Sequence, residues 1–390
     1  MSNTDLLIRT ARSLCLLAIV VCVVCFNYPK NIASASHNLP TPPSNQAKGA
    51  ALIDVQSGRL IFSQRGDEKM KIASLTKIMT AIVAIEHSSL DDEVKVSVRA
   101  AGKEGSSLYL KAGEKMTLRN LIFGLMLRSG NDAAVAIAEH VGGSVEGFAF
   151  LMNKKAEEIG LLGSHFMNPH GLDDPQHYST PNDMARLTAY ALHNKDFRNI
   201  VSTKVKSAPN PNESWDYKWV NKNKMLHLYE GADGVKTGYT KQALRCLVSS
   251  ATRDGQQLAV VTLNDGDDWS DHRKLLDYGF NHFQLTEVIG AGEVVPGTAY
   301  QAVNTFRYPF ASGEQEELRF RVVPRDVTSA AYALGDRGQI EFVLDRKVIG
   351  SIALAPALGQ TERSDTREHE TSSFRHSLHA SFNALMFAGG

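Results

Sequence analysis

Three short motifs, S-x-x-K, S-x-N and K-T-G, stand in that order along the chain and constrain its fold more than any other feature. Ser74 and Lys77 form the first motif, at the start of an apolar run whose spacing predicts a helix. Ser129 and Asn131 form the second, at the junction of two helical patterns, and Lys236 begins the third on a predicted strand. A fold that uses all three motifs must bring these elements to the walls of one cleft.

The residue types of the first motif suit nucleophilic catalysis. A serine hydroxyl is a poor nucleophile unless a base lies beside it. Lys77 follows Ser74 by three positions, which on a helix places it on the same face, one turn on. A lysine acts as a base only if its pKa falls, through desolvation and a nearby cation. The apolar neighbours of Lys77 would supply the desolvation and Lys236 the cation. A serine at a helix N-terminus also has a backbone N–H free to hold an oxyanion.

The other motif residues have matching roles. Ser129 would relay the proton of the leaving group, and Asn131 would hold a peptide carbonyl of the substrate. Gly238 has no Cβ, so an extended peptide can approach the predicted strand and pair with it by β-addition.

Each of these residues also has a purely structural interpretation. Ser74 and Asn131 could be helix caps, and Lys236 could be a solvated strand residue. For any one residue taken alone, the structural interpretation is favoured. Three motifs in order, each on its expected element, favour the catalytic one.

Residues 1–35 are interpreted as a secretory signal peptide. Basic residues precede an apolar run over 13–26 that is short for a transmembrane helix, and a small-residue stretch indicates cleavage after Ala35. The alternative is an uncleaved membrane anchor. The mature chain would keep one cysteine, Cys246, and therefore no internal disulfide, and we expect this side chain to be a small buried apolar group.

The mature chain changes pattern three times. A Pro-rich leader covers residues 36–48. Residues 49–283 show a strand pair, then helices, then a strand meander with a final helix, which predicts a mixed α/β (α+β) domain and not a repeated βαβ ladder. Residues 284–360 alternate apolar and polar side chains with little helical pattern, which predicts a small all-β domain.

The C-terminal segment, residues 361–390, is expected to associate with a membrane. A polar linker is followed by apolar residues at helical spacing over residues 373–388. After a linker at the end of an exported chain, this pattern indicates an amphipathic helix lying in a membrane surface. The alternative is a helix that docks back on the protein.

Composition argues against one class of partner. The 42 basic and 42 acidic side chains give a formal net charge of zero, which argues against nucleic-acid binding through a strong basic field.

His165, His170 and His177 cluster in one segment, but the spacing fits no HExxH or Cys/His metal motif. We expect structural histidines near the cleft, with no metal and no cofactor.

The motifs and the segments around them resemble a known family, the low-molecular-mass penicillin-binding proteins that are serine-type D-Ala-D-Ala carboxypeptidases (peptidase family S11). The resemblance covers about residues 45–283 and rests on "ASLTKIMTA", "LRSGNDAAVAIAEHVGGS", "HFMNPHGLDDPQHYST" and "GADGVKTGYT". It extends less specifically to the small β domain and the terminal helix. It implies a β-lactamase/transpeptidase-like fold, with an antiparallel sheet flanked by helices.

The resemblance also implies a reaction. Ser74 would form an acyl-enzyme with Lys77 as general base, and Thr237 would bind the terminal carboxylate of the substrate. The backbone N–H groups of Ser74 and Tyr239 would form the oxyanion hole. The enzyme would remove the terminal D-alanine from the pentapeptide stems of peptidoglycan, and penicillin would acylate Ser74. It would act outside the cell, at the outer face of the cytoplasmic membrane or in the cell-wall space.

Two positions depart from the family pattern. Many members carry an arginine in the loop after the last strand, whereas this chain has the acidic "NDGDDWSDH" with no arginine before Arg273. Binding of the terminal carboxylate would therefore depend more on Lys236 and Thr237, with Arg245 as a further candidate. Leu244 stands where a glycine is usual.

Other functions use the same motifs. A class A β-lactamase needs a glutamate to activate the deacylating water, and Glu157 and Glu158 lie instead in a helical pattern. Endopeptidase or transpeptidase activity differs only in the choice of acceptor. A non-catalytic wall-binding protein is disfavoured because every expected catalytic residue is present. The sequence leaves open the residue at position 3 of the stem peptide.

Overall fold

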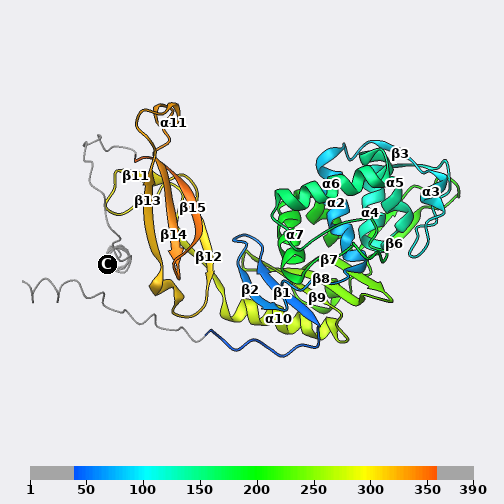
Figure 1. Ribbon diagram of the computed structural model, residues 1–390, viewed down its shortest axis with the longest axis horizontal. Coiled ribbons are helices and arrows are strands. Elements are labelled where there is room, and N and C mark those ends of the chain that lie inside the picture. Colours follow the sequence, from blue (N-terminus) through cyan, green and yellow to red (C-terminus); the bar gives the residue numbers. More distant parts are fainter. Residues whose placement is uncertain (1–38, 358–390) are drawn as a thin grey trace, which may run out of the picture. The chain divides into compact units, whose positions relative to one another are not determined.

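The computed structural model describes residues 39–357 (Figure 1). The predicted signal peptide, the first residues of the leader, and the C-terminal linker and helix (361–390) lie outside the described residues. The predictions for those segments stay predictions.

A five-stranded antiparallel sheet, in the order β2-β1-β9-β8-β7, is the centre of the main domain (Figure 1). Two of its turns follow directly from the sequence. The first predicted hairpin turns at Ser57-Gly58, and the second turns at Asp254-Gly255, where both residues have positive φ (48° and 79°) as a tight hairpin requires. The strands are β1 (Gly49–Asp54), β2 (Leu60–Gln64), β7 (Ala232–Thr240), β8 (Leu244–Arg253) and β9 (Gln256–Leu263).

The sheet is covered on both faces, which explains why β1 and β9 are mostly apolar and why the middle of β8 is buried at consecutive positions. Alternate side chains of β8 enter two separate cores: Cys246 and Val248 join the larger core, and Leu247 joins the core that includes Leu275 of α10. Because both faces exclude water, apolar residues are favoured at consecutive positions. Helix α10 (Asp268–His282) packs against β8 and β9 on the second face (Figure 1).

Helices that face the larger core occupy the middle of the sequence, as the spacing predicts. The start of α7 (Pro181–His193) follows from its local sequence: Thr180 accepts a hydrogen bond from Asp183 N, and Pro181 takes the first helical position. The helices are η1 (Ala73–Thr76), α2 (Lys77–His87), α3 (Val98–Ala101), α4 (Leu118–Arg128), α5 (Asn131–Gly142), α6 (Val145–Glu158), α7 (Pro181–His193), α8 (Lys195–Ser202) and α9 (Met225–Leu228). Two small antiparallel pairs, β3 (Glu93–Lys95) with β4 (Lys115–Thr117) and β5 (Val205–Ala208) with β6 (Tyr217–Val220), lie among them.

The α/β (α+β) prediction for the main region is therefore confirmed, with an antiparallel sheet between helical layers. In the described part of the chain no single helix is long and apolar enough to cross a membrane; only the bent pair of α5 and α6 meets the length and composition criteria together.

The C-terminal region is rich in strands and has its own core. A four-stranded sheet runs in the order β11-β15-β14-β13, and β10 pairs with β12. The alternating burial along β14 matches the alternation of "QIEFVL", and the turn to β15 places Asp345 and Arg346 at positive φ. The elements are β10 (Gln284–Ile289), β11 (Tyr300–Ala302), β12 (Phe306–Phe310), η2 (Glu314–Glu317), β13 (Arg319–Pro324), α11 (Ala330–Ala333), β14 (Gly338–Leu344) and β15 (Lys347–Pro356). The two short helices were not predicted.

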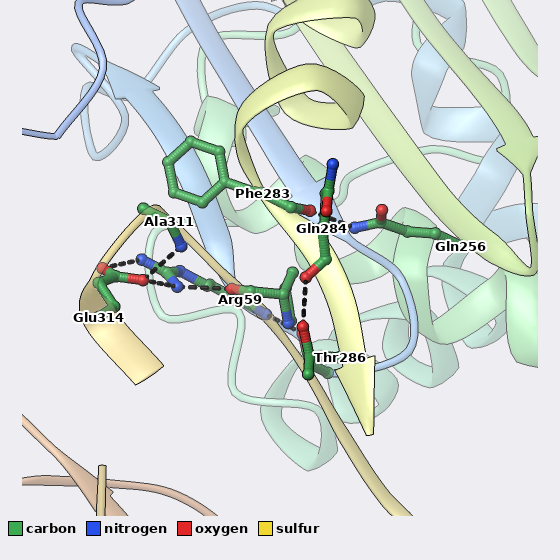
Figure 2. Close-up of polar contacts among 9 residues, drawn as sticks. Arg59, Gln256, Phe283, Gln284, Thr286, Ala311 and Glu314 are labelled. Carbon is green, nitrogen blue, oxygen red and sulfur yellow. Dashed lines mark hydrogen bonds and ion pairs between the residues drawn. The ribbon is translucent and has the colours of Figure 1, made fainter. Parts of the chain in front are cut away.

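Arg59, just before β2, makes a buried ion pair with Glu314 (Figure 2). Its guanidinium donates two hydrogen bonds to the carboxylate, each at 2.6 Å, and one to the carbonyl of Pro309 at 2.6 Å. Glu314 also accepts from the backbone N–H of Ala311 at 2.7 Å. Both side chains are nearly buried, with 13% and 9% of their surface exposed. The ring of Phe283 lies 5.0 Å from the guanidinium carbon.

Glu314→Gln is expected to lower the free energy of unfolding by about 2–3 kcal/mol, because it leaves the buried guanidinium of Arg59 without its counter-charge. Urea unfolding of the full-length protein measures this. The matched control is Glu287→Gln, which breaks the exposed pair of Glu287 with Arg307 and should cost less than about 0.5 kcal/mol. Equal effects of the two substitutions would contradict the importance of burial here.

Candidate active site

Ser74 lies in the η1 turn directly before α2, pressed against β7. The turn begins with Ala73 at a positive φ of 46° and approaches two glycines closely. A Cβ on Gly171 would lie 1.9 Å from the carbonyl oxygen of Ala73, and a Cβ on Gly238 would lie 3.2 Å from the backbone nitrogen of Ser74. Gly238 is thus needed for the approach of the Ser74 turn to β7, in addition to its predicted use for a substrate backbone.

Lys77, the first residue of α2, is fully buried and touches three acceptors. Its Nζ lies 3.1 Å from Ser74 Oγ, 2.8 Å from Asn131 Oδ1 and 2.7 Å from the carbonyl oxygen of His170. An amide oxygen and a backbone carbonyl can only accept hydrogen bonds, whereas the Ser74 hydroxyl can also donate. A neutral Lys77 amine that donates to Asn131 and His170 therefore presents its lone pair to the Ser74 proton.

The surroundings of Lys77 favour this neutral form. Burial is the largest cause that lowers the pKa of Lys77 well below its ordinary value, followed by the charges of Lys236 and Lys222, while Asp132 opposes them. Desolvation and the cation Lys236 are the two causes expected from the sequence; Lys222 was not foreseen.

Asn131 and Ser129 line the same site. Asn131 also donates from Nδ2 to the carbonyl of Glu104 at 2.7 Å, so its amide is oriented with the oxygen toward Lys77. Ser129 ends α4 with a positive φ of 67°, and its buried Oγ has no hydrogen-bond partner within residues 39–357. Its hydroxyl is therefore available to hydrogen-bond a substrate.

The structural interpretations of these motif residues do not fit. No side chain caps η1 or α5, whose cap positions are Ile72 and Gly130. The side-chain amide of Asn131 instead hydrogen-bonds with Lys77 and with the carbonyl of Glu104. Lys236 is not a solvated strand residue, because only 1% of its surface is exposed.

Lys236 brings the third motif to the site from β7. Its Nζ donates to the carbonyl of Thr237 at 2.8 Å. Burial, helped by the charge of Lys222, lowers the pKa of Lys236 to about 7. Thr237 is half-buried and Tyr239 is 64% exposed, so both are accessible along the edge strand. The eight residues expected from the sequence thus come from η1, α2, the α4–α5 junction and β7.

The structure adds Lys222 and the carbonyl of His170 to this group. Lys222 follows β6; its backbone N–H donates to Leu127 at 3.1 Å and its Nζ lies 3.5 Å from Ser106 Oγ. The next residue, Asn223, is buried and donates to the carbonyl of Gly234, two residues before Lys236. The asparagines on either side of Lys222 are the only sequence signal that this loop is held in place.

The histidine cluster supports the nucleophile turn. His177 Nδ1 accepts from the Met167 N–H at 3.0 Å, so Nε2 carries the proton and donates to Thr76 Oγ1 at 2.8 Å. Burial lowers the pKa of His177 to about 4 and that of His170 to about 2, so both rings are neutral near pH 7. Within residues 39–357 no group of three or more His, Cys, Asp or Glu side chains is arranged to hold a metal ion.

Arg245, a candidate for binding the terminal carboxylate, is engaged elsewhere. It makes a two-pronged ion pair with Asp268 of α10, and β8 pairs it with Tyr239, one register step from the pair of Gly238 and Cys246. Because successive side chains of a strand point to opposite faces, Arg245 lies on the α10 face of the sheet. Arg245 is thus held by Asp268, and Lys236 remains as the cation of the three motifs for a carboxylate.

Three other sequence expectations can be placed. Cys246 is buried, and burial raises the pKa of its thiol to about 12, which fits a small apolar group. Leu244, where a glycine is usual, adopts a positive φ of 57°. Glu157 and Glu158 end α6 and pair with Lys154 and Lys155, so they are not aimed at the acyl site.

Comparisons with known proteins indicate one family. The sequence pattern of a family described as D-alanyl-D-alanine carboxypeptidase matches residues 36–267. A D-alanyl-D-alanine carboxypeptidase of Bacillus subtilis, DacF, is 34% identical over 249 residues, which is 62% of this chain and 64% of that protein. The chain thus spans a little less than two thirds of that relative. DacA of Haemophilus influenzae is 32% identical over 345 residues, 80% of this chain and 85% of that protein.

A solved structure extends the similarity to most of the described residues. Penicillin binding protein 5 from Haemophilus influenzae superimposes with a TM-score of 0.68 at 28% identity, over 81% of this chain and 98% of that one. The match covers the C-terminal strands as well as the main sheet, because it extends well beyond the fraction of the chain that lies in the main domain.

Proposed function

The chain belongs to the D-alanyl-D-alanine carboxypeptidase family, whose members act through a serine acyl-enzyme and are acylated by penicillin, and we propose that it removes the terminal D-alanine from peptidoglycan pentapeptide stems with Ser74 as nucleophile. The observation that supports the assignment of residues most directly is the contact of Lys77 Nζ with Ser74 Oγ, inside a pocket whose burial lowers the pKa of Lys77 well below its ordinary value.

Acylation follows from these contacts. Lys77 takes the proton of Ser74, and Oγ attacks the carbonyl carbon of the penultimate D-alanine. The N–H groups of Ser74 and Tyr239 hold the oxyanion that forms. Lys77 returns the proton, through the unpartnered hydroxyl of Ser129, to the nitrogen of the terminal D-alanine. The C–N bond then breaks and free D-alanine leaves.

Deacylation reuses the same base. Water gives one proton to Lys77 as its oxygen attacks the ester, and the proton goes back to Ser74 Oγ as the shortened stem leaves. A β-lactam enters by the same attack, but the ring that opens stays attached to the acyl group. Its nitrogen therefore blocks the path of water, which gives a long-lived adduct.

Lys236 and Thr237 bind the terminal carboxylate in this proposal. Lys236 is buried beside the site, and Thr237 is half-buried on the exposed edge of β7. The stem peptide pairs in an extended form with β7, beside Gly238.

Incubation of the purified protein with a D-Ala-D-Ala peptide and, separately, with penicillin tests the proposal. Released D-alanine together with a stable penicilloyl adduct is expected. Rapid turnover of penicillin without D-alanine release would instead favour a β-lactamase. Release that depends on an added amine acceptor would favour transpeptidation. The absence of both D-alanine release and a penicilloyl adduct would favour a non-catalytic wall-binding protein.

Location and domain roles are part of the same proposal. The family acts on peptidoglycan, outside the cytoplasm, and we propose export through residues 1–35 and attachment to the outer face of the membrane through residues 373–388. The proposed boundaries, 49–283 for catalysis and 284–360 for the β domain, agree with the separate core of the C-terminal strands. Loss of membrane sedimentation on deletion of residues 373–388 is the expected result; unchanged sedimentation would contradict the attachment.

Lys222→Met is expected to move the acid limb of the penicillin acylation rate to higher pH, by about 0.3–1 pH unit. The sign follows from the charges: removal of a cation favours protonated Lys77, raises the pKa of Lys77, and so delays formation of the neutral base. A pH–rate profile of acylation measures the shift. Lys224→Met, which removes a lysine two positions away, is the control and should leave the limb in place. A limb that does not move in Lys222→Met would contradict the electrostatic argument.

A further inference from the structure

A cavity of about 350 Å³ lies at the end of the main sheet, where β7 turns into β8. The mechanism above makes no use of it. Three lysines stand in its wall with groups that can donate hydrogen bonds or pack against a ligand: Lys48, Lys69, Lys71, Tyr178, Gln242 and Ala243.

The cavity carries more positive than negative charge. Lys71 Nζ donates only to backbone carbonyl oxygens, those of Asp174, Pro175 and His177, so within residues 39–357 no carboxylate contacts its charge. Lys69 Nζ lies 4.6 Å from the ring centre of Tyr178. Three ammonium groups thus line a small space whose charge is only partly compensated.

One carboxylate compensates part of this charge. Glu68 pairs with Lys48 at 2.9 Å, and both side chains are about two fifths exposed (39% and 44%). A pair this exposed is weak and readily exchanged for another partner. An anion that enters the cavity can therefore compete for Lys48, and no carboxylate of residues 39–357 forms an ion pair with Lys69.

The wall of the cavity belongs to the same network as the nucleophile. Lys71 precedes Ser74 by three residues and donates to the carbonyl of His177 at 3.0 Å. His177 Nε2 donates to Thr76 Oγ1, which donates to the carbonyl of Ala73. Hydrogen bonds therefore connect the wall of the cavity with the turn that carries Ser74.

The direction of the substrate leads toward this cavity. With the terminal carboxylate at Thr237 and the scissile carbonyl at Tyr239 N–H, the acyl side of the stem continues along β7 toward Thr240 and the turn. Gln242 lies in the turn after β7, three residues past Tyr239, so the two residues are at most about 10 Å apart along the chain. On this path, the groups that would reach the cavity belong to residues two or three positions before the scissile bond.

We propose that this cavity binds a free carboxylate on the acyl side of the stem peptide, two or three residues before the scissile bond. The proposal rests on the proposed carboxypeptidase function and adds the chemistry of the upstream residue to it. The lysines attract a carboxylate and repel a side-chain amine at the same position, so the cavity selects stems that carry an acidic group there.

Two synthetic peptides test the proposal. Both end in D-Ala-D-Ala, and they differ only in a carboxylate or a carboxamide two residues before the scissile bond. The wild-type protein is expected to release D-alanine from the carboxylate peptide with a kcat/KM about three- to tenfold higher, because exposed charge pairs contribute little each. The ratio should fall in high salt. Lys69→Met and Lys48→Met should bring the ratio toward one.

Lys154→Met is the matched control, since it removes an exposed lysine of α6 that pairs with Glu157 and leaves the cavity unchanged. It should keep the wild-type ratio. Equal release from both peptides by the wild type would overturn the cavity proposal alone, as would a ratio that survives in both cavity variants. Release from neither peptide would overturn the carboxypeptidase proposal itself, so the two failures are distinguishable.

Discussion

Ser74→Ala is expected to abolish both D-alanine release and the penicillin adduct, with a loss of at least about 10⁴-fold in acylation rate. The reason is covalent: without Oγ no ester can form, and the neutral Lys77 amine has no hydroxyl to deprotonate. Release of D-alanine is measured with an enzymatic assay and the adduct by mass spectrometry of the intact protein.

The fold should survive this substitution. Lys77 keeps its contacts with Asn131 and His170, and the Ser74 side chain caps no helix. Ser89→Ala, in the exposed segment after α2, is the matched serine control and should retain both activities. A penicillin adduct on the Ser74→Ala protein would show that another residue is the nucleophile, with Ser129 the first to test.

The sequence predicts the side chains of this site better than the backbone contacts that position them. Ser74, Lys77, Asn131 and Lys236 were found because their chemistry is in their side chains and their spacing fits helices and a strand. The carbonyl of His170 contacts Lys77 just as closely, yet any residue has a carbonyl, so no residue type could indicate it.

Asp132 shows the same limit. Its buried carboxylate accepts from the N–H groups of Leu108 and Leu110 and from the hydroxyl of Ser107, and so holds the loop whose Ser106 carbonyl binds Asn131 N–H. In the sequence, Asp132 is simply an acidic residue in the first turn of a helix. A contact between segments more than twenty residues apart leaves no local pattern to read.

In the fold, too, local features could be predicted from the sequence and contacts between distant segments could not. The hairpins at Ser57-Gly58 and Asp254-Gly255 and the cap at Thr180 were predictable because glycine, proline and capping side chains act locally. The strand order was not, because it depends on which apolar faces meet. Arg245 illustrates the consequence: its place on the α10 face depends on the register of β7 with β8, which the sequence does not state.

Lys77→Arg is expected to lower the rate of acylation by about 10²–10⁴-fold, the usual contribution of a positioned general base. Arginine keeps the positive charge and much of the length of lysine, but its guanidinium does not lose a proton in proteins. If Lys77 acted mainly as a fixed cation, the substitution would be mild. The acid limb of the pH–rate profile should also disappear, since the group that titrates has been removed. Stopped-flow acylation by a chromogenic β-lactam over a range of pH measures both effects.

A second buried lysine, Lys155, provides the control for Lys77→Arg. Lys155 in α6 is 7% exposed, and hydrogen bonds with Glu158 and Glu86 outweigh the effect of burial and raise the pKa of Lys155 above its ordinary value. It is a structural cation, so Lys155→Arg should keep its ion pairs and leave acylation near the wild-type rate. Two lysines with little exposed surface would then respond oppositely to one substitution, because the base must be neutral and the structural cation charged. Near-normal acylation by Lys77→Arg would contradict the assignment of Lys77 as the base.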